Sequence, residues 1–103
     1  MFRRGRFDEL VRRQLDLFET DEATLLREAS DADREWTSAS AEESEELYGD
    51  YQLVVDAIGD RLYDVREGYA SSLDEAAADE YRTTFDRVAR KRFGRLASFL
   101  EEG

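Results

Sequence analysis

Two arginine-rich stretches carry the side chains best suited to bind an anion. The first begins Phe2-Arg3-Arg4-Gly5-Arg6-Phe7, where guanidinium groups alternate with aromatic rings around a glycine. Guanidinium groups bind phosphate oxygens through two parallel hydrogen bonds, and aromatic rings stack on nucleobases. The second stretch lies near the end of the chain, at 82–95. We take the following as candidate partner-binding or nucleic-acid-binding residues: Arg3, Arg4, Arg6, Arg12, Arg13, Arg90 and Arg92, together with Trp36 as a candidate contact to a protein partner.

An intramolecular alternative exists for the arginines of the second stretch. Cations near a helix C-terminus complement the helix dipole. Residues 87–95 could also pair with carboxylates of an antiparallel neighbouring helix, namely Asp56, Asp60, Asp64 and Glu67. In the fold predicted below, Arg12 and Arg13 lie at the same end as Arg82 and away from residues 90–95. The two stretches are therefore not expected to form one patch.

Carboxylates at helical spacing could bind a metal ion, which is a second possible chemistry. Glutamates occur in pairs three residues apart at 42–46, and Asp56 and Asp60 follow four residues apart. Such spacing places several oxygen ligands on one helical face, as a hard cation such as Mg²⁺ requires. The alternative is a solvated acidic face, which we favour because Asp and Glu make up 26 of the 103 residues.

The segment Asp-Ala-Ile-Gly-Asp-Arg-Leu-Tyr at 56–63 resembles the second motif of all-α nucleoside-triphosphate pyrophosphohydrolases, which pair a helical Glu-x-x-Asp with an upstream Glu-x-x-Glu. The resemblance covers about forty residues. Ala57 stands where that family has a glutamate. The resemblance implies a metal-dependent hydrolase with the ligands Glu42, Glu43, Glu46 and Asp60. We favour the alternative, and predict no catalytic residue, no metal and no cofactor.

Composition excludes several classes of site. The chain has no His, no Cys and no Pro, which removes zinc sites, disulfides and the common nucleophilic triads. The net charge is −11, and Lys91 is the one lysine among 15 cations. Abundant carboxylate with little lysine resembles proteins of salt-loving archaea, so we predict a halophilic, cytoplasmic protein. No apolar window is long enough to span a membrane.

Apolar residues recur at helical spacing throughout, and no stretch alternates as a strand would. A first helix is predicted at about 6–36, because a heptad seam runs from Phe7 through Leu15 to Trp36. Two helices with a break near 19–21 are the alternative, with Thr20 or Asp21 as the cap.

Two capping boxes predict the starts of the other helices. Ser40 and Glu43 would begin a second helix that ends at Gly68, and Ser72 and Glu75 would begin a third that continues to about Leu100. Gly94 would interrupt the third helix only mildly.

These elements predict a single all-α domain over 1–103, a three-helix up-down-up antiparallel bundle preceded by a flexible basic segment at 1–6. The heptad seams are typical of coiled coils. Our first hypothesis is therefore a non-enzymatic interaction module that self-associates or docks on a protein complex, without a membrane or a small-molecule substrate. The alternatives are a protein associated with nucleic acid or the ribosome through its N-terminal arginines, and a diverged pyrophosphohydrolase.

Overall fold

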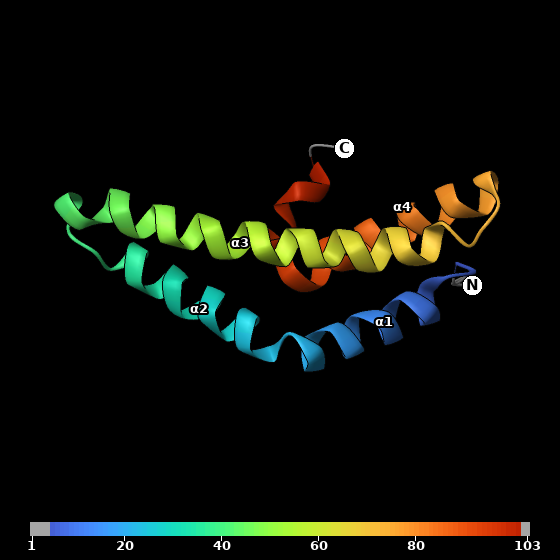
Figure 1. The fold of residues 1–103 in the computed structure, drawn as a ribbon, viewed down its shortest axis with the longest axis horizontal. Helices are drawn as coiled ribbons and strands as arrows, with labels where there is room; N and C mark the ends of the chain where they lie inside the picture. Colours follow the sequence, from blue (N-terminus) through green and yellow to red (C-terminus); the bar gives the residue numbers. More distant parts are fainter. Residues whose placement is uncertain (1–4, 102–103) are drawn as a thin grey trace, which may run out of the picture.

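The computed structural model describes residues 5–101, and the side chains of residues 5–97. Within this range the chain is helical and contains no strand, which confirms the all-α class (Figure 1). The order along the chain is α1 (Asp8–Asp21), α2 (Ala23–Thr37), α3 (Ala41–Ala70), α4 (Glu75–Phe93) and a 3₁₀ segment η1 (Gly94–Glu101). Over residues 5–101, four α-helices take the place of the predicted three.

The prediction of one long first helix is wrong, and the alternative with a break is closer. The helix ends at Asp21, and Glu22 links it to α2 with φ −109° and ψ 27°. The Glu22 carboxylate lies 3.3 Å from the guanidinium of Arg61 on α3, so a charged group occupies the seam at the bend. Because of the bend, α1 and α2 form the two sides of a wide V, and α3 runs across its open end (Figure 1).

The helix ends agree with the predicted signals only in part. Ser40 is the N-cap residue of α3, although its side chain makes no capping hydrogen bond. The third predicted helix is capped by Asp74, which accepts a 2.8 Å hydrogen bond from the Ala77 N–H. Ser72 does not cap it, because its hydroxyl donates to the carbonyl of Tyr69. Gly68 does not end α3, which continues to Ala70.

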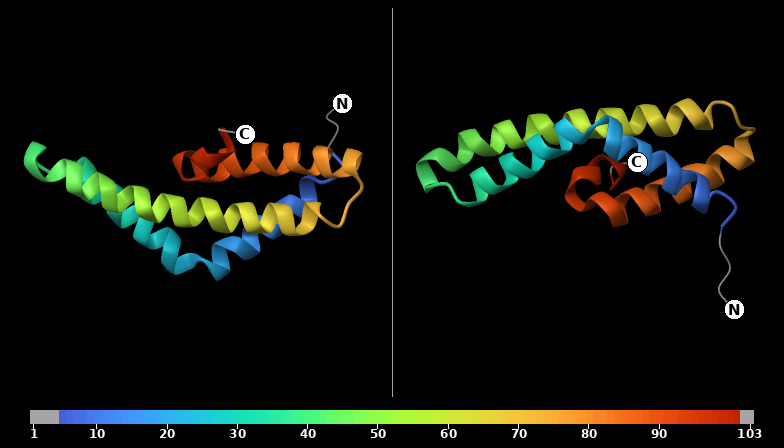
Figure 2. Two further views of the ribbon diagram at one scale, coloured as in Figure 1. Left: turned by 45° about the horizontal axis from the view of Figure 1, so that its top comes forward. Right: turned by 90° about the horizontal axis from the view of Figure 1, so that it is seen from below.

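Gly94 ends α4, so the prediction of a helix to Leu100 is wrong. Its φ of +56° and ψ of −124° fit glycine far better than a residue with a side chain. Beyond it η1 turns back across α3, with a kink at Ala97. As a result α4 covers only one half of α3, as both views in Figure 2 show.

The core lies where α1, α3 and α4 meet. Its largest completely buried side chains include Tyr81, Phe85, Leu15, Ile58 and Leu62. Ile58 and Leu62 therefore face the interior as their seam predicts, whereas Val88 is only half-buried. None of the described helices combines the length and the apolar composition that crossing a membrane requires.

The other half of α3 is not covered by α4 and packs mainly against α2. Together these two segments form a projection that we call the arm (residues 30–55), and η1 contacts its base through Arg95, which lies against Asp33 and Tyr51. The radius of gyration is 15.7 Å and the longest dimension is 50 Å. A compact chain of this length has a radius of gyration of about 13 Å. The arm accounts for this elongation, because it extends beyond the end of α4 (Figure 2).

Candidate functional sites

The N-terminal arginines have different surroundings. Arg3 and Arg4 lie outside the described residues. Arg6 lies 3.4 Å from a carboxylate oxygen of Glu80, and its guanidinium sits 4.7 Å from the centre of the Phe7 ring. Arg13 is exposed and lies 3.6 Å from Glu9, one turn earlier on α1. These two arginines therefore have internal partners.

Arg12 lies in a different place from the one predicted. It lines a groove between α1 and α4 together with Arg87, Val88, Lys91 and Arg92, and this groove encloses about 300 Å³. We call these five residues the basic groove. The expectation that Arg12 lies at the same end as Arg82 and away from residues 90–95 is wrong, because α1 pairs with α4 further along: Phe7 contacts Tyr81, and Phe18 contacts Phe93. Arg12 therefore does share a patch with the second stretch, contrary to the prediction.

The arginines near the end of α4 do form ion pairs, but with α1 and α2 and not with α3. Arg87 donates a 2.7 Å hydrogen bond to Asp8, and Arg92 donates one of 2.7 Å to Asp16. Beyond α4, Arg95 reaches Asp33 of α2 at 2.7 Å. For these three arginines of 87–95 the predicted pairing with carboxylates of α3 is wrong, because the register puts α1 along that side of α4.

Asp8 is held by more than Arg87. The backbone N–H of Gly5 donates a 3.1 Å hydrogen bond to its carboxylate. That hydrogen bond is the main cause that lowers the pKa of Asp8, and Arg87 and the nearby charge of Arg12 lower it further. Arg90 is exposed, and it has no ion-pair partner among the described residues.

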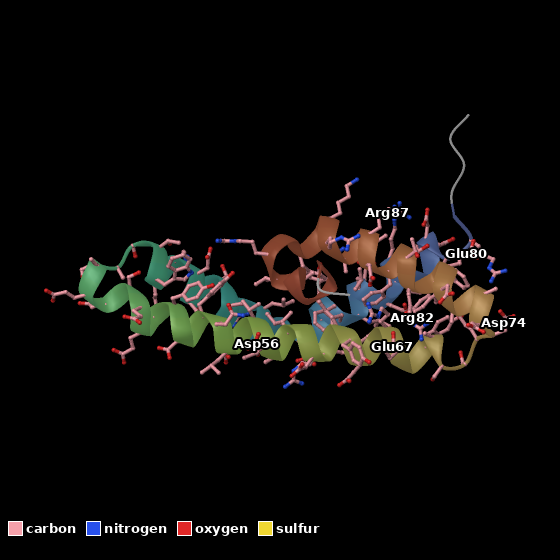
Figure 3. The ribbon with its side chains drawn as sticks, turned by 90° about the horizontal axis from the view of Figure 1, so that it is seen from above. Asp56, Glu67, Asp74, Glu80, Arg82 and Arg87 are labelled. Carbon is pink, nitrogen blue, oxygen red and sulfur yellow. The ribbon has the colours of Figure 1, made fainter. Side chains whose placement is uncertain are left out.

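On the other side of α4, a carboxylate of α3 binds two guanidinium groups. Glu67 lies beside Arg82 (Figure 3) and accepts hydrogen bonds of 3.0 and 2.9 Å from it. Glu67 also accepts one of 2.9 Å from Arg66. Arg66 in turn donates a 2.8 Å hydrogen bond to Asp86. The hydrogen bonds from Arg82 are the largest cause that lowers the pKa of Glu67. This network fixes α4 on α3.

The carboxylates of the predicted metal site do not gather. Glu42, Glu43, Glu46 and Asp60 are all exposed on the single helix α3. Glu46 and Asp60 are separated by roughly 21 Å along the helix axis at 1.5 Å per residue. Among the described residues, no group of three or more acidic side chains could hold a metal ion. The geometry therefore does not assemble the ligand set that the resemblance to pyrophosphohydrolases implied.

Aromatic side chains line a second groove, on the arm. Its walls come from α2, from α3 and from the turn after α4, and it encloses about 430 Å³. We call it the aromatic groove; its lining residues are Trp36, Tyr48, Tyr51, Gln52, Val55, Gly94 and Arg95. The Trp36 ring lies 5.1 Å from Tyr48 and 6.0 Å from Tyr51, measured between ring centres.

The aromatic groove contains polar groups as well as aromatic rings. The Trp36 indole nitrogen is buried, and no hydrogen-bond partner for it occurs among the described residues. The guanidinium of Arg95 lies 5.9 Å from the centre of the Tyr51 ring. Burial raises the pKa of Tyr51 above its ordinary value of 10.0. The groove can therefore contact a partner through the exposed Tyr48 ring and the exposed guanidinium of Arg95.

Of the predicted contact residues, Trp36 lies in the aromatic groove, and Arg12 and Arg92 lie in the basic groove. Arg87, Lys91, Gln52 and Arg95 were not among the predicted site residues. The sequence carried one signal for two of them, since Arg87 and Lys91 are like charges four positions apart on a helix, an arrangement that costs stability.

Comparison with known proteins does not assign the chain to a family. No family model, curated protein or solved structure matches it.

Proposed function

We propose that the protein is a non-enzymatic helical interaction module that self-associates through the arm. In this proposal the arms of two copies lie side by side, and their four helices enclose the two aromatic grooves. The observation that carries the proposal is the aromatic groove itself, which lies where α4 ends and the arm continues with only two helices.

The aromatic groove supports self-association because it continues a face that is buried elsewhere on α3. Tyr48, Val55 and Leu62 are seven residues apart, so they share one face of the helix. Leu62 is completely buried in the core, whereas Tyr48 is 46% exposed. A second arm would cover this part of the face as the rest of the fold covers Leu62. Exposed Trp and Tyr side chains are frequent anchors of protein interfaces.

Charge on the arm determines how self-association should depend on salt. The first turns of α3 carry exposed carboxylates and no cation, namely Glu42, Glu43, Glu45, Glu46 and Asp50. Two arms side by side therefore repel each other at low ionic strength. In 1 M salt the Debye length is about 3 Å, which screens most of this repulsion. Self-association should therefore strengthen as salt increases, unlike an interface held by ion pairs.

Light scattering on the purified full chain tests the proposal. We expect monomers at low ionic strength and dimers in molar salt. Tyr48→Ala should weaken the dimer at least about tenfold, the loss of about 1.4 kcal/mol of binding energy. Tyr63→Ala is the matched control, since Tyr63 is on the same helix, is 49% exposed and lies outside the aromatic groove.

Circular dichroism would establish that both variants remain helical. A monomer at every salt concentration, or equal weakening by the two substitutions, would exclude self-association through the arm.

A further inference from the structure

The basic groove lies away from the arm, and its composition is unusual for this chain. Four of its five lining residues are cationic, and no carboxylate is among them. The chain as a whole has a net charge of −11. Positive charge is therefore concentrated here against the trend of the rest of the sequence.

The four cations of the basic groove differ in whether they form ion pairs. Arg87 is paired with Asp8, and Arg92 lies 2.7 Å from Asp16 and 3.6 Å from Glu19. Lys91 and Arg12 have no ion-pair partner among the described residues. The groove therefore has two cations that form no ion pair among the described residues, next to two guanidinium groups that carboxylates hold in place.

The paired guanidinium groups still have hydrogen bonds to offer. Each guanidinium has five N–H donors in a fixed plane. Arg87 uses one terminal nitrogen on Asp8, and Arg92 uses one on its acidic partners. Their orientation is thus fixed by ion pairs at the edge of the groove, while other N–H groups stay available to a ligand.

This set of donors fits phosphate. Planar guanidinium groups match the oxygens of a phosphate, and a lysine ammonium adds a compact point charge. Two neighbouring cations without ion-pair partners among the described residues favour an anion with at least two negative charges over a single carboxylate. The one apolar lining residue is Val88, and no aromatic ring lines the groove within the described residues, so a ligand would be held by its phosphates and not by base stacking.

We propose that the basic groove is a binding site for linked phosphate groups, with Arg12 and Lys91 as the residues that contribute most to affinity. Free oligophosphates and the phosphodiester backbone of a single-stranded nucleic acid supply the same chemistry. The site is independent of self-association through the arm, because none of its residues lines the aromatic groove.

Titration calorimetry on the purified full chain tests the site with two probes, inorganic tripolyphosphate and a short oligothymidylate. The test variant is Arg12→Gln with Lys91→Gln. The control is Arg27→Gln with Arg34→Gln on α2, which changes the net charge equally at exposed positions outside the groove.

We expect the test variant to weaken binding at least about tenfold, and the control to change it by less than about twofold. For the single-stranded oligonucleotide, the magnitude of the slope of log affinity against log salt should also fall by about 1.4, about 0.7 for each lost phosphate contact.

The outcomes separate the two phosphate sources. Binding of tripolyphosphate alone identifies free oligophosphate as the ligand, and binding of the oligonucleotide alone identifies the backbone. Binding of both supports a site for linked phosphates of either origin. Binding of neither probe, or equal losses in the test and control variants, would overturn the proposal, because net charge alone would then explain any affinity.

Discussion

The hydroxyl of Tyr81 donates a 2.7 Å hydrogen bond to the side-chain oxygen of Gln14, which joins α4 to α1 inside the core. The Tyr81 ring is completely buried, with Phe7 edge-on at 5.6 Å and Tyr69 at 4.8 Å. Burial raises the pKa of Tyr81 to about 12, although the hydrogen bond to Gln14 opposes this shift. The contact therefore links the packing of three helices to pH.

We expect alkaline pH to destabilise the fold through Tyr81. Between pH 10 and about 12 the hydroxyl ionises in the unfolded chain but stays protonated in the folded one. The free energy of unfolding should thus decrease as pH rises through this window, by up to about 1.4 kcal/mol per pH unit. Tyr81→Phe should lose about 1 kcal/mol at neutral pH and lack this part of the slope. Urea unfolding from pH 8 to 11.5 measures both, and identical slopes would contradict the assignment.

Glu67 should make the opposite contribution at acid pH. Its folded pKa lies below the ordinary 4.5 because Arg82 and Arg66 donate hydrogen bonds to it. Its contribution to stability is therefore present above pH 4.5 and lost as pH falls through the lowered folded pKa. Glu67→Gln should cost about 1–2 kcal/mol at pH 7 and much less at pH 2.5.

The control for this prediction is Glu28→Gln, an exposed glutamate of α2 that has no ion pair among the described residues. It should change stability by less than about 0.5 kcal/mol at either pH. Chemical denaturation at the two pH values tests the pair. If Glu67→Gln costs as much at pH 2.5 as at pH 7, the carboxylate charge is not what joins α3 to α4.

Two glycines should respond to alanine with opposite signs. Gly94 has φ +56°, where a Cβ is strained even though nothing lies within 4 Å of it, so Gly94→Ala should cost about 1–2 kcal/mol. Gly49 lies within α3, also with nothing within 4 Å. Gly49→Ala should stabilise the helix by about 0.5–1 kcal/mol. Thermal unfolding should show Tm falling in the first variant and rising in the second. The same sign in both would mean that the turn at Gly94 is not under conformational constraint.

Two leucines of α3 lie on opposite sides of the helix, one in the core and the other facing solvent. Leu62 is completely buried and Leu53 is 70% exposed. Leu62→Ala removes packed methyl groups and leaves a cavity, so it should cost about 2–5 kcal/mol. Leu53→Ala should change stability by less than about 0.5 kcal/mol. Urea unfolding of both variants compares the costs, and a large loss in Leu53→Ala would require a contact that covers this residue.

Some of the residues that line the two grooves could be predicted from the sequence. Trp36, Arg12 and Arg92 are predicted contact residues that lie in them, whereas Arg90 is outside both and Arg6 and Arg13 pair with nearby glutamates. Arg95 reaches the aromatic groove only because Gly94 redirects the chain. A side chain placed by a turn in this way leaves no trace in helical periodicity.

The sequence by itself determined the helical class, the start of α3 after Ser40 and the burial of Ile58 and Leu62. These depend on local periodicity and capping, which act over one or two turns. Only the tertiary structure decided the bend at Glu22, the end of α4 at Gly94 and the register that brings Arg12 beside Lys91. Periodicity fixes which face of a helix is buried, but the partner and the register of that face depend on contacts between residues far apart in the chain.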